Sequence, residues 1–226
     1  MSRTARDEIL DTLRQTRDIE APARPDLPPA RELSLSKEEL IQKFTTLLEA
    51  EAGVVHRVDS REAALSKLTE VLKTKGITRI MASSDPFLAG MDLPGWGRNQ
   101  SIEIMTTDFF ETRTDYKDAA FNRVQAGLTG ADYLVAETGT IVLAHDAGQA
   151  RLISLAPMTH IVLAPSDRLV PIHERVVGEI FSKAQIPSQV CFITGPSMTG
   201  DIEGQLCKGM HGPQKVIVIL IDLKKT

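Results

Sequence analysis

The sequence predicts an α/β fold of three layers, with a mixed, mostly parallel sheet between helices. From residue 34 onward, expected strands alternate with expected helices of about 10 to 16 residues, a pattern typical of this architecture. The last expected strand contains an unbroken apolar run at residues 216–221, which indicates a strand covered on both faces. A hairpin-like centre between residues 132 and 163 adds some antiparallel pairing.

Composition limits the classes of partner. The chain has 226 residues and a net charge of −4, so no basic excess is available to neutralise nucleic-acid phosphates. The longest apolar run is far too short to cross a bilayer, and the first 20 residues contain no apolar block of signal-peptide length. We therefore expect no nucleic-acid partner, no membrane insertion and a cytoplasmic location.

Cysteine chemistry is limited as well. Cys191 and Cys207 fit no zinc or thioredoxin-like spacing, and no HExxH pair is present, so we expect no metal site. A cluster ligated only by cysteine needs four thiolates, which this chain cannot supply. We interpret both cysteines as reduced, partly buried thiols.

The N-terminal segment, residues 1–33, is expected to be an arm that precedes the α/β body at residues 34–226. Residues 2–18 suit a short amphipathic helix with an apolar stripe of Ile9, Leu10 and Leu13. Four prolines within residues 21–30 exclude helix and favour an extended tether. The arm could pack on its own body, dock on a partner or exchange with a second copy.

The first half of the body begins with a strong helix signal. Ser36 is a good N-cap and Glu39 completes a capping box, so a helix should start here and end before Gly53. Asp85 and Pro86 should open a short helix. The remaining expectations are a strand at 54–58, a helix at 60–75, a strand at 79–83, a loop at 94–97, a strand at 101–105 and a helix at 115–126.

The second half is rich in strands. A glycine-rich turn at residues 127–130 precedes the segment 132–163, which should break at Glu137, at residues 146–148 and near Pro157. The remaining expectations are a helix at about 171–184, a strand at 190–194, a turn at 195–196, a short helix at about 199–208 and a final strand at 215–223.

The turn at Glu137 is the first candidate site. Glu137, Thr138, Gly139 and Thr140 lie between two apolar, strand-forming stretches. A carboxylate there is costly unless it has partners or a task, such as general base, nucleophile or hydroxyl-binding group. Nearby Gly130 would allow close approach of a ligand, although no P-loop lysine is present. The alternative is a plain hairpin with an exposed glutamate.

A second candidate lies at residues 195–203, where a strand leads into a turn and the expected helix. Backbone N–H groups at a helix N-terminus attract anions, so Ser197, Thr199, Gly200 and Asp201 would contact one. Ligands in α/β sheets bind at such strand ends. Ordinary helix capping is the alternative.

Four further side chains could join or flank these sites. His160 and His211 lie at strand edges in turns that contain glycine or proline, and could meet Glu137; each alone is more often structural. Arg151 could clamp a carboxylate or phosphate, or could be a surface charge on a strand. Trp96 could line a pocket or cap the core.

Together these motifs resemble the lactate utilisation protein C family of the LUD-domain group. The resemblance runs from about residue 34 to the end of the chain and is carried by residues 127–140, 151–157, 160–161, 193–197, 201–203 and 211–213. The N-terminal helix and proline-rich tether also resemble the family's usual start. Met198 and Gly200 depart from it, because the family typically has Arg and Ala at these positions, so an anion contact would be lost here.

The resemblance implies a fold like the ribose-phosphate isomerase, glucosamine-phosphate deaminase and CoA-transferase group. It also implies a subunit for oxidation of L-lactate to pyruvate, with iron–sulfur clusters on partner proteins and no redox cofactor on this chain. Two alternatives stay open: a stand-alone enzyme on a phosphorylated or acyl, CoA-like substrate using Glu137, and a non-catalytic scaffold or regulator. A small carboxylate ligand and a homo-oligomer also stay open.

Overall fold

The computed structural model describes residues 4–15, 33–146, 149–182, 186–200 and 206–223, and divides the chain into two units, Met1–Arg31 and Glu32–Thr226. The first unit contains α1 (Ala5–Gln15), which confirms the expected helix. Its apolar Ile9 and Leu13 are exposed, and no residue of α1 is buried. The expected proline-rich tether lies outside the described residues.

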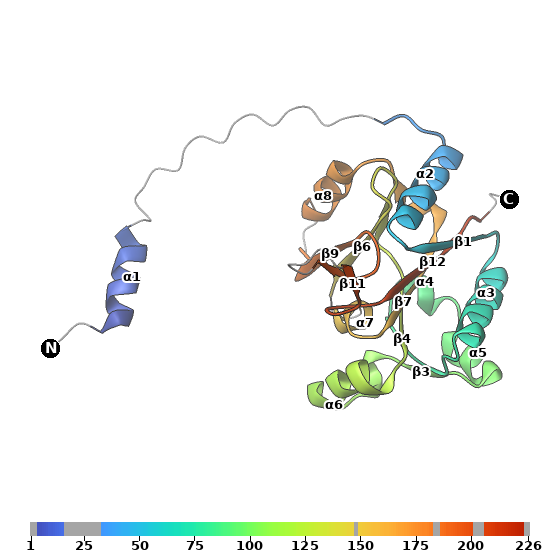
Figure 1. Ribbon diagram of the computed structural model, residues 1–226, viewed down its shortest axis with the longest axis horizontal. Coiled ribbons are helices and arrows are strands. Elements are labelled where there is room, and N and C mark those ends of the chain that lie inside the picture. Colours follow the sequence, from blue (N-terminus) through green and yellow to red (C-terminus); the bar gives the residue numbers. More distant parts are fainter. Residues whose placement is uncertain (1–3, 16–32, 147–148, 183–185, 201–205, 224–226) are drawn as a thin grey trace. The chain divides into compact units, whose positions relative to one another are not determined.

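The main sheet of the second unit has six strands, and each pairing in it is parallel (Figure 1). This confirms the expected α/β class with a mostly parallel sheet. In spatial order the strands are β1 (Val54–Val58), β12 (Lys215–Ile221), β7 (Thr159–Pro165), β4 (Ala126–Thr129), β2 (Arg79–Ala82) and β3 (Glu103–Met105).

Antiparallel pairing occurs in a second, four-stranded sheet. Its order is β8 (Leu169–Val170), β5 (Tyr133–Val135), β6 (Thr140–His145) and β9 (Gln189–Ile193). β5 and β6 form the expected hairpin around Glu137, and β6 also pairs antiparallel with β9. The strands at the centre of the chain therefore form a layer of their own.

Helices and the second sheet cover the two faces of the main sheet (Figure 1). On one face, Leu68 of α3 and Leu88 of α4 join the same apolar cluster as Ile219 of β12. On the other face, Phe44 of α2 and Leu134 of β5 join a separate cluster. The helices of this core are α2 (Lys37–Ala50), α3 (Arg61–Thr74), α4 (Pro86–Ala89), α5 (Leu93–Gln100) and, outside the second sheet, α8 (His173–Phe181).

The apolar run of β12 is buried on both faces, as its composition predicts. Ile217, Ile219 and Ile221 pack with α3, whereas Val218 and Leu220 pack toward α2 and the second sheet. A strand with both faces covered has no need for polar alternation. Burial of this strand therefore connects the two apolar clusters.

Helix starts follow the capping signals. Ser36 and Glu39 form the expected capping box at α2, and Ser60 caps α3. Asp85 accepts hydrogen bonds from the first amides of α4, whose first residue is Pro86. Each cap is formed by residues within a few positions of one another, and this explains why the sequence alone predicts them.

The expectation of a loop at 94–97 is wrong, because these residues belong to α5. The Asp92 side chain accepts a hydrogen bond from the Gly95 amide, and Pro94 lies in the first turn, where a missing N–H costs little. Gly97 lies against Ile104 of β3 and leaves no room for a side chain. Packing on β3 therefore overrides the low helix propensity of two glycines.

The glycine-rich turn expected at 127–130 is also wrong, because residues 126–129 form the buried strand β4. The preceding helix ends earlier than expected: α6 (Arg113–Asp118) continues as a π-helical turn, Ala119–Arg123. A Cβ on Gly127 would lie 1.7 Å from the Ile153 carbonyl oxygen. Glycine here admits a neighbouring backbone rather than a turn.

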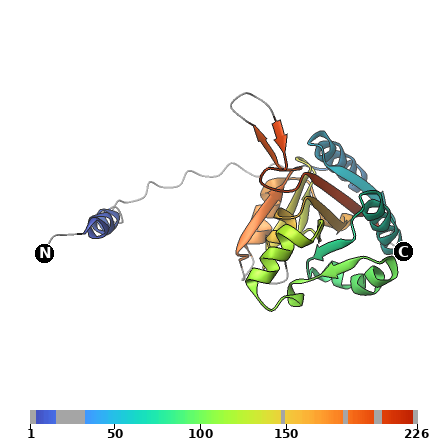
Figure 2. The same ribbon diagram turned by 60° about the horizontal axis from the view of Figure 1, so that its bottom comes forward.

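The short helix expected at about 199–208 is wrong as well. Residues 198–200 form β10 (Met198–Gly200), which pairs antiparallel with β11 (Leu206–Lys208) and projects from the body (Figure 2). Residues 201–205 lie outside the described residues. Thr199 and Gly200 are weak helix formers, so strand pairing with Cys207 and Leu206 prevails.

We predict that Gly127→Ala lowers the free energy of unfolding by at least about 2 kcal/mol, because the added methyl group meets backbone that cannot move aside. Urea denaturation followed by circular dichroism measures this. Gly178→Ala in α8 is the matched control: its Cβ meets nothing within 4 Å, so stability should stay equal or rise by about 0.5–1 kcal/mol. Equal stabilities for Gly127→Ala and the wild type would contradict the prediction.

Candidate functional site

Glu137 lies at the N-terminus of α8. Its Oε1 accepts a hydrogen bond of 2.8 Å from the His173 amide, the first helical amide, while its own amide donates to the Pro171 carbonyl at 3.1 Å. A carboxylate at this position compensates unpaired amides and the positive end of the helix dipole. These contacts account for a half-buried carboxylate in the hairpin turn.

The rest of the turn lies against α2. Gly139 has a φ of +64°, and a Cβ there would lie 2.4 Å from the Leu48 amide nitrogen. The hydroxyls of Thr138 and the buried Thr140 lie 2.7 Å apart. The four candidate residues 137–140 therefore join the hairpin to two helices, α2 and α8.

Gly130 follows β4, and the Asp85 carboxylate occupies the place that its side chain would take, 2.6 Å from a Cβ. The same carboxylate forms an ion pair with Arg168 at 3.3 Å. Gly130 thus makes room for a side chain of this protein.

His160 is completely buried on β7, in register with Gly127 on one side and Val216 on the other. Its Nε2 lies 2.8 Å from the Thr129 hydroxyl, and its Nδ1 has no hydrogen-bond partner among the described residues. Burial, and then the nearby His145, lower the pKa of His160 to about 3. This imidazole is therefore neutral at physiological pH.

His211 is exposed in the loop before β12, and Ser197 lies beside the same loop. The Ser197 amide donates to the Pro213 carbonyl and its carbonyl accepts from the Gly209 amide, both at 2.8 Å. Thr199 lies on β10, and Asp201 lies outside the described residues. Because Thr199 is in a strand, the helix N-terminus expected to hold an anion is not formed there.

The structure separates Glu137 from the buried histidines. The hairpin turn lies at one end of the second sheet, where Ile141 pairs with Ile193, and His145 lies at the other end, where it pairs with Gln189. At about 3.3 Å per residue, Thr140 and His145 are about 17 Å apart. His160 lies near His145 and bonds Thr129, so it does not share a site with Glu137.

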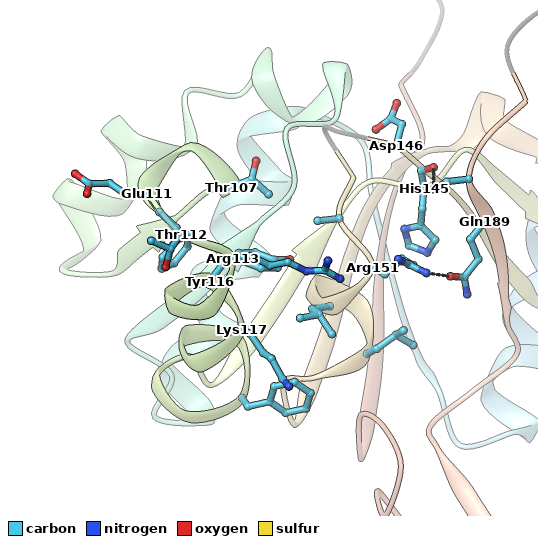
Figure 3. A pocket seen from close by; sticks show the side chains of 16 residues that line it. Thr107, Glu111, Thr112, Arg113, Tyr116, Lys117, His145, Asp146, Arg151 and Gln189 are labelled. Atoms are coloured by element: carbon cyan, nitrogen blue, oxygen red, sulfur yellow. Dashed lines mark hydrogen bonds between the residues drawn. The ribbon is translucent and has the colours of Figure 1, made fainter.

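A pocket of about 750 Å³ opens between α6 and α7 (Leu152–Leu155), a short helix not expected from the sequence (Figure 3). Arg151 directly precedes α7 and is not on a strand, so the alternative of a strand charge does not apply. Its Nη1 donates to Gln189 Oε1 at 2.9 Å. The other polar side chains that line the pocket include Arg113, Tyr116, Lys117, His145 and Gln189.

Two of these polar groups have hydrogen-bonding capacity that the described residues do not use. His145 is 1 % exposed, and its Nδ1 lies 2.8 Å from the Gln149 carbonyl oxygen, so Nδ1 is the donor in this contact. Neither this Nε2 nor the Tyr116 hydroxyl has a partner among the described residues. Burial raises the pKa of Tyr116 to about 12, so its hydroxyl remains a donor.

Arg113, Tyr116, Lys117 and His145 were not among the residues expected to form a site. The first three have the spacing i, i+3, i+4, which places them on one side of a helix. That spacing was the available signal, but many surface helices share it. His145 had no turn chemistry to mark it, because its environment comes from β9 and the loop after β6.

Both cysteines are free thiols. The expected partial burial is confirmed for Cys191 and wrong for Cys207, which is exposed on β11. Trp96 packs against the core cluster that contains α3 and lines a separate hollow beside that helix. In the described part of the chain, no three His, Cys, Asp or Glu side chains are grouped so as to hold a metal ion.

We predict that Glu137→Ala lowers the free energy of unfolding by about 1 kcal/mol, because the first amide of α8 loses its acceptor. Glu137→Gln retains an oxygen acceptor and should lose less. Urea denaturation distinguishes these variants. Glu49→Ala, at an exposed position of α2, is the control and should leave stability within about 0.5 kcal/mol. A Glu137→Ala protein as stable as this control would contradict a capping role.

We predict that His160 makes the fold sensitive to acid. Unfolded histidine takes up a proton near pH 6.5, whereas buried His160 does so only near pH 3, so the unfolded state gains the proton first as the pH falls. Stability should therefore decline between these values, by on the order of 4 kcal/mol. Denaturation midpoints measured from pH 7 to 4 should decline less steeply for His160→Gln. The exposed-site control His211→Gln should follow the wild type; identical slopes for all three proteins would refute the assignment.

Comparisons with known proteins agree with the architecture. Residues 41–221 match the LUD domain family. A crystal structure of a DUF162 family protein from Deinococcus radiodurans superposes with a TM-score of 0.60, at 21% identity, covering 83% of this chain and 99% of that chain, which shows a shared fold. Among the described residues, no helix has the length and apolarity needed to cross a membrane.

Two curated relatives extend the comparison over nearly the whole chain. Lactate utilization protein C of Oceanobacillus iheyensis is 31% identical, covering 96% of this chain and 98% of its own length. The protein of the same name from Halalkalibacterium halodurans is 28% identical, covering 88% of each chain. The chain therefore belongs to the LUD domain family, in its lactate utilization protein C group.

Proposed function

We propose that this chain is a subunit needed for oxidation of L-lactate to pyruvate and acts together with iron–sulfur proteins. The observation that carries the proposal is similarity over 96% of the chain to a relative named Lactate utilization protein C. The similarity extends over the helices and both sheets, since the family match covers residues 41–221. We therefore assign the proposed role in lactate oxidation to the whole α/β body.

The chemistry supports a division of labour between subunits. Converting lactate to pyruvate removes two electrons and two protons, so an electron acceptor is required. Two cysteines cannot supply the four thiolates of an all-cysteine cluster. We propose that the partner proteins carry the clusters and that this chain supplies binding and structural surfaces.

The pocket beside α7 supports a role in holding an anionic molecule. Arg151 and Arg113 line it from different elements, and arginine binds carboxylates through paired N–H groups. L-lactate is a small carboxylate and would fill only part of the space. The role of Arg151 as a carboxylate clamp follows the expectation from sequence.

We predict that a strain lacking this gene fails to grow on L-lactate as sole carbon source, because lactate oxidation would stop. Complementation with wild type should restore growth, whereas Arg151→Gln should restore it poorly. Arg98→Gln, an exposed arginine of α5, is the control and should behave as wild type. Affinity capture of the tagged chain from its host should recover iron–sulfur proteins.

Growth without the gene would refute the proposal, provided no second copy is present. Full rescue by Arg151→Gln would instead favour a scaffold, in which the pocket has no task. Rescue by Glu137→Gln would support the capping role of Glu137 over a catalytic one. These results together distinguish a substrate-binding subunit from a scaffold, and a capping role of Glu137 from a catalytic one.

The second candidate function is a stand-alone enzyme on a phosphorylated or acyl substrate. The size of the pocket favours it, since about 750 Å³ suits a ligand larger than lactate. In that case the reacting groups would include His145, whose Nε2 has no hydrogen-bond partner among the described residues. Loss of turnover in a His145→Gln protein, for a substrate found by screening, would test it.

A further inference from the structure

We propose that the pocket between α6 and α7 is a binding site for a phosphorylated organic anion of about nucleotide size. Arg113, Lys117 and Arg151 would hold the phosphate groups, and the apolar side chains of the same pocket would hold the organic part. This inference shares the pocket and Arg151 with the proposed function and assigns them a larger, phosphorylated ligand.

The volume of the pocket sets the size of the ligand. Pockets for drug-sized molecules measure about 300–1,000 Å³, and this one measures about 750 Å³. A three-carbon acid would leave most of that space to water. The pocket therefore suits a ligand with two parts, a charged group and a larger organic group.

The charges of the pocket favour phosphate. Arg113 and Lys117 are four residues apart on α6, and no ion pair or hydrogen bond joins either side chain to another described residue. Figure 3 shows the Arg113 side chain extending toward the part of the pocket that contains Arg151. The carboxylates of Glu111 and Asp146 point away from these guanidinium groups. Guanidinium groups match phosphate oxygens in geometry and charge.

Two polar groups give a second, independent indication of a ligand. Buried polar groups are normally hydrogen-bonded, because a missing partner is costly. His145 lines the pocket, is 1 % exposed and has no partner for Nε2 among the described residues. The Tyr116 hydroxyl also lacks one there. Both atoms have almost no accessible surface, so a ligand in the pocket would bond to them only after the side chains that cover them move.

The apolar part of the pocket offers a place for a flat organic group. Phe110 and Phe121 line it from the side of α6, and Leu152 and Leu155 line it from α7. Phe121 and Leu155 are exposed although they are large and apolar. A ring placed between them would cover apolar surface that now faces water.

Calorimetric titration of the full chain with ADP, inorganic pyrophosphate and L-lactate tests the site. We expect ADP to bind more tightly than pyrophosphate, because only ADP contacts the apolar side chains, and lactate, which would contact Arg151 without filling the pocket, to compete only weakly. Arg113→Gln and Arg151→Gln should each weaken ADP binding about tenfold or more. Arg98→Gln, on α5, is the matched control and should bind as the wild type does.

Tyr116→Phe separates binding from folding. Removing a hydroxyl that has no partner in the described part of the chain should leave the free protein equally stable or more stable, while ADP affinity falls. The proposal is overturned if ADP does not bind, if pyrophosphate binds as tightly as ADP, or if Arg113→Gln and Arg98→Gln bind equally well. Growth of the deletion strain on lactate tests the subunit role by itself, so failure of ADP binding overturns the phosphate site and leaves Arg151 available as the carboxylate clamp of the proposed function.

Discussion

The contact between Gly127 and Ile153 is the constraint on which the site depends. Because Gly127 has no side chain, the backbone of α7 lies directly on the buried strand β4. This contact fixes the start of α7, and Arg151 directly precedes that helix. The same glycine is in register with His160 on β7, so the residue that admits the backbone of α7 also lies beside the buried imidazole. Any side chain at position 127 would block this approach of the two backbones.

The hairpin β5–β6 connects two chemically different regions. At its turn, Glu137 and Gly139 are in contact with helices α8 and α2, and their interactions are those of a structural joint. At the far end, His145 lines the pocket, and its Nε2 has no hydrogen-bond partner among the described residues. Both ends contain titratable groups within a mainly apolar strand pair. Only the end at His145 combines burial, open hydrogen-bonding capacity and neighbouring cations.

Much of the fold can be predicted from sequence because its signals are local or compositional. The Ser36 and Glu39 capping box, the Asp85 cap and the apolar run of β12 each act through neighbouring residues or through uniform burial. The errors arise where distant contacts decide. The sequence alone predicts a turn at Gly127, because it does not show that Ile153 packs against this residue. It predicts a helix at Thr199, because it does not show the strand pairing with Cys207.

The candidate site is less predictable for the same reason. Arg151 could be identified, since an arginine among glycine and apolar residues stands out in the sequence. His145 could not, because its proton is positioned by Gln149 and its burial depends on the second sheet. Glu137 stands out in the sequence and nevertheless has a sufficient structural explanation in the cap of α8. A conspicuous carboxylate is thus a weaker guide than a buried group without a partner.

The position of β12 has a consequence for how the chain reaches this structure. β12 is the last strand described, yet it lies between β1 and β7, and pairs Val54 with Ile217. During synthesis, β1 therefore waits for nearly the whole body before it can join the sheet, and β7 keeps an open apolar edge. Pairings between strands this distant in sequence slow folding and leave unpaired, aggregation-prone strand edges exposed until folding is complete. The main sheet can therefore be completed only after β12 has left the ribosome.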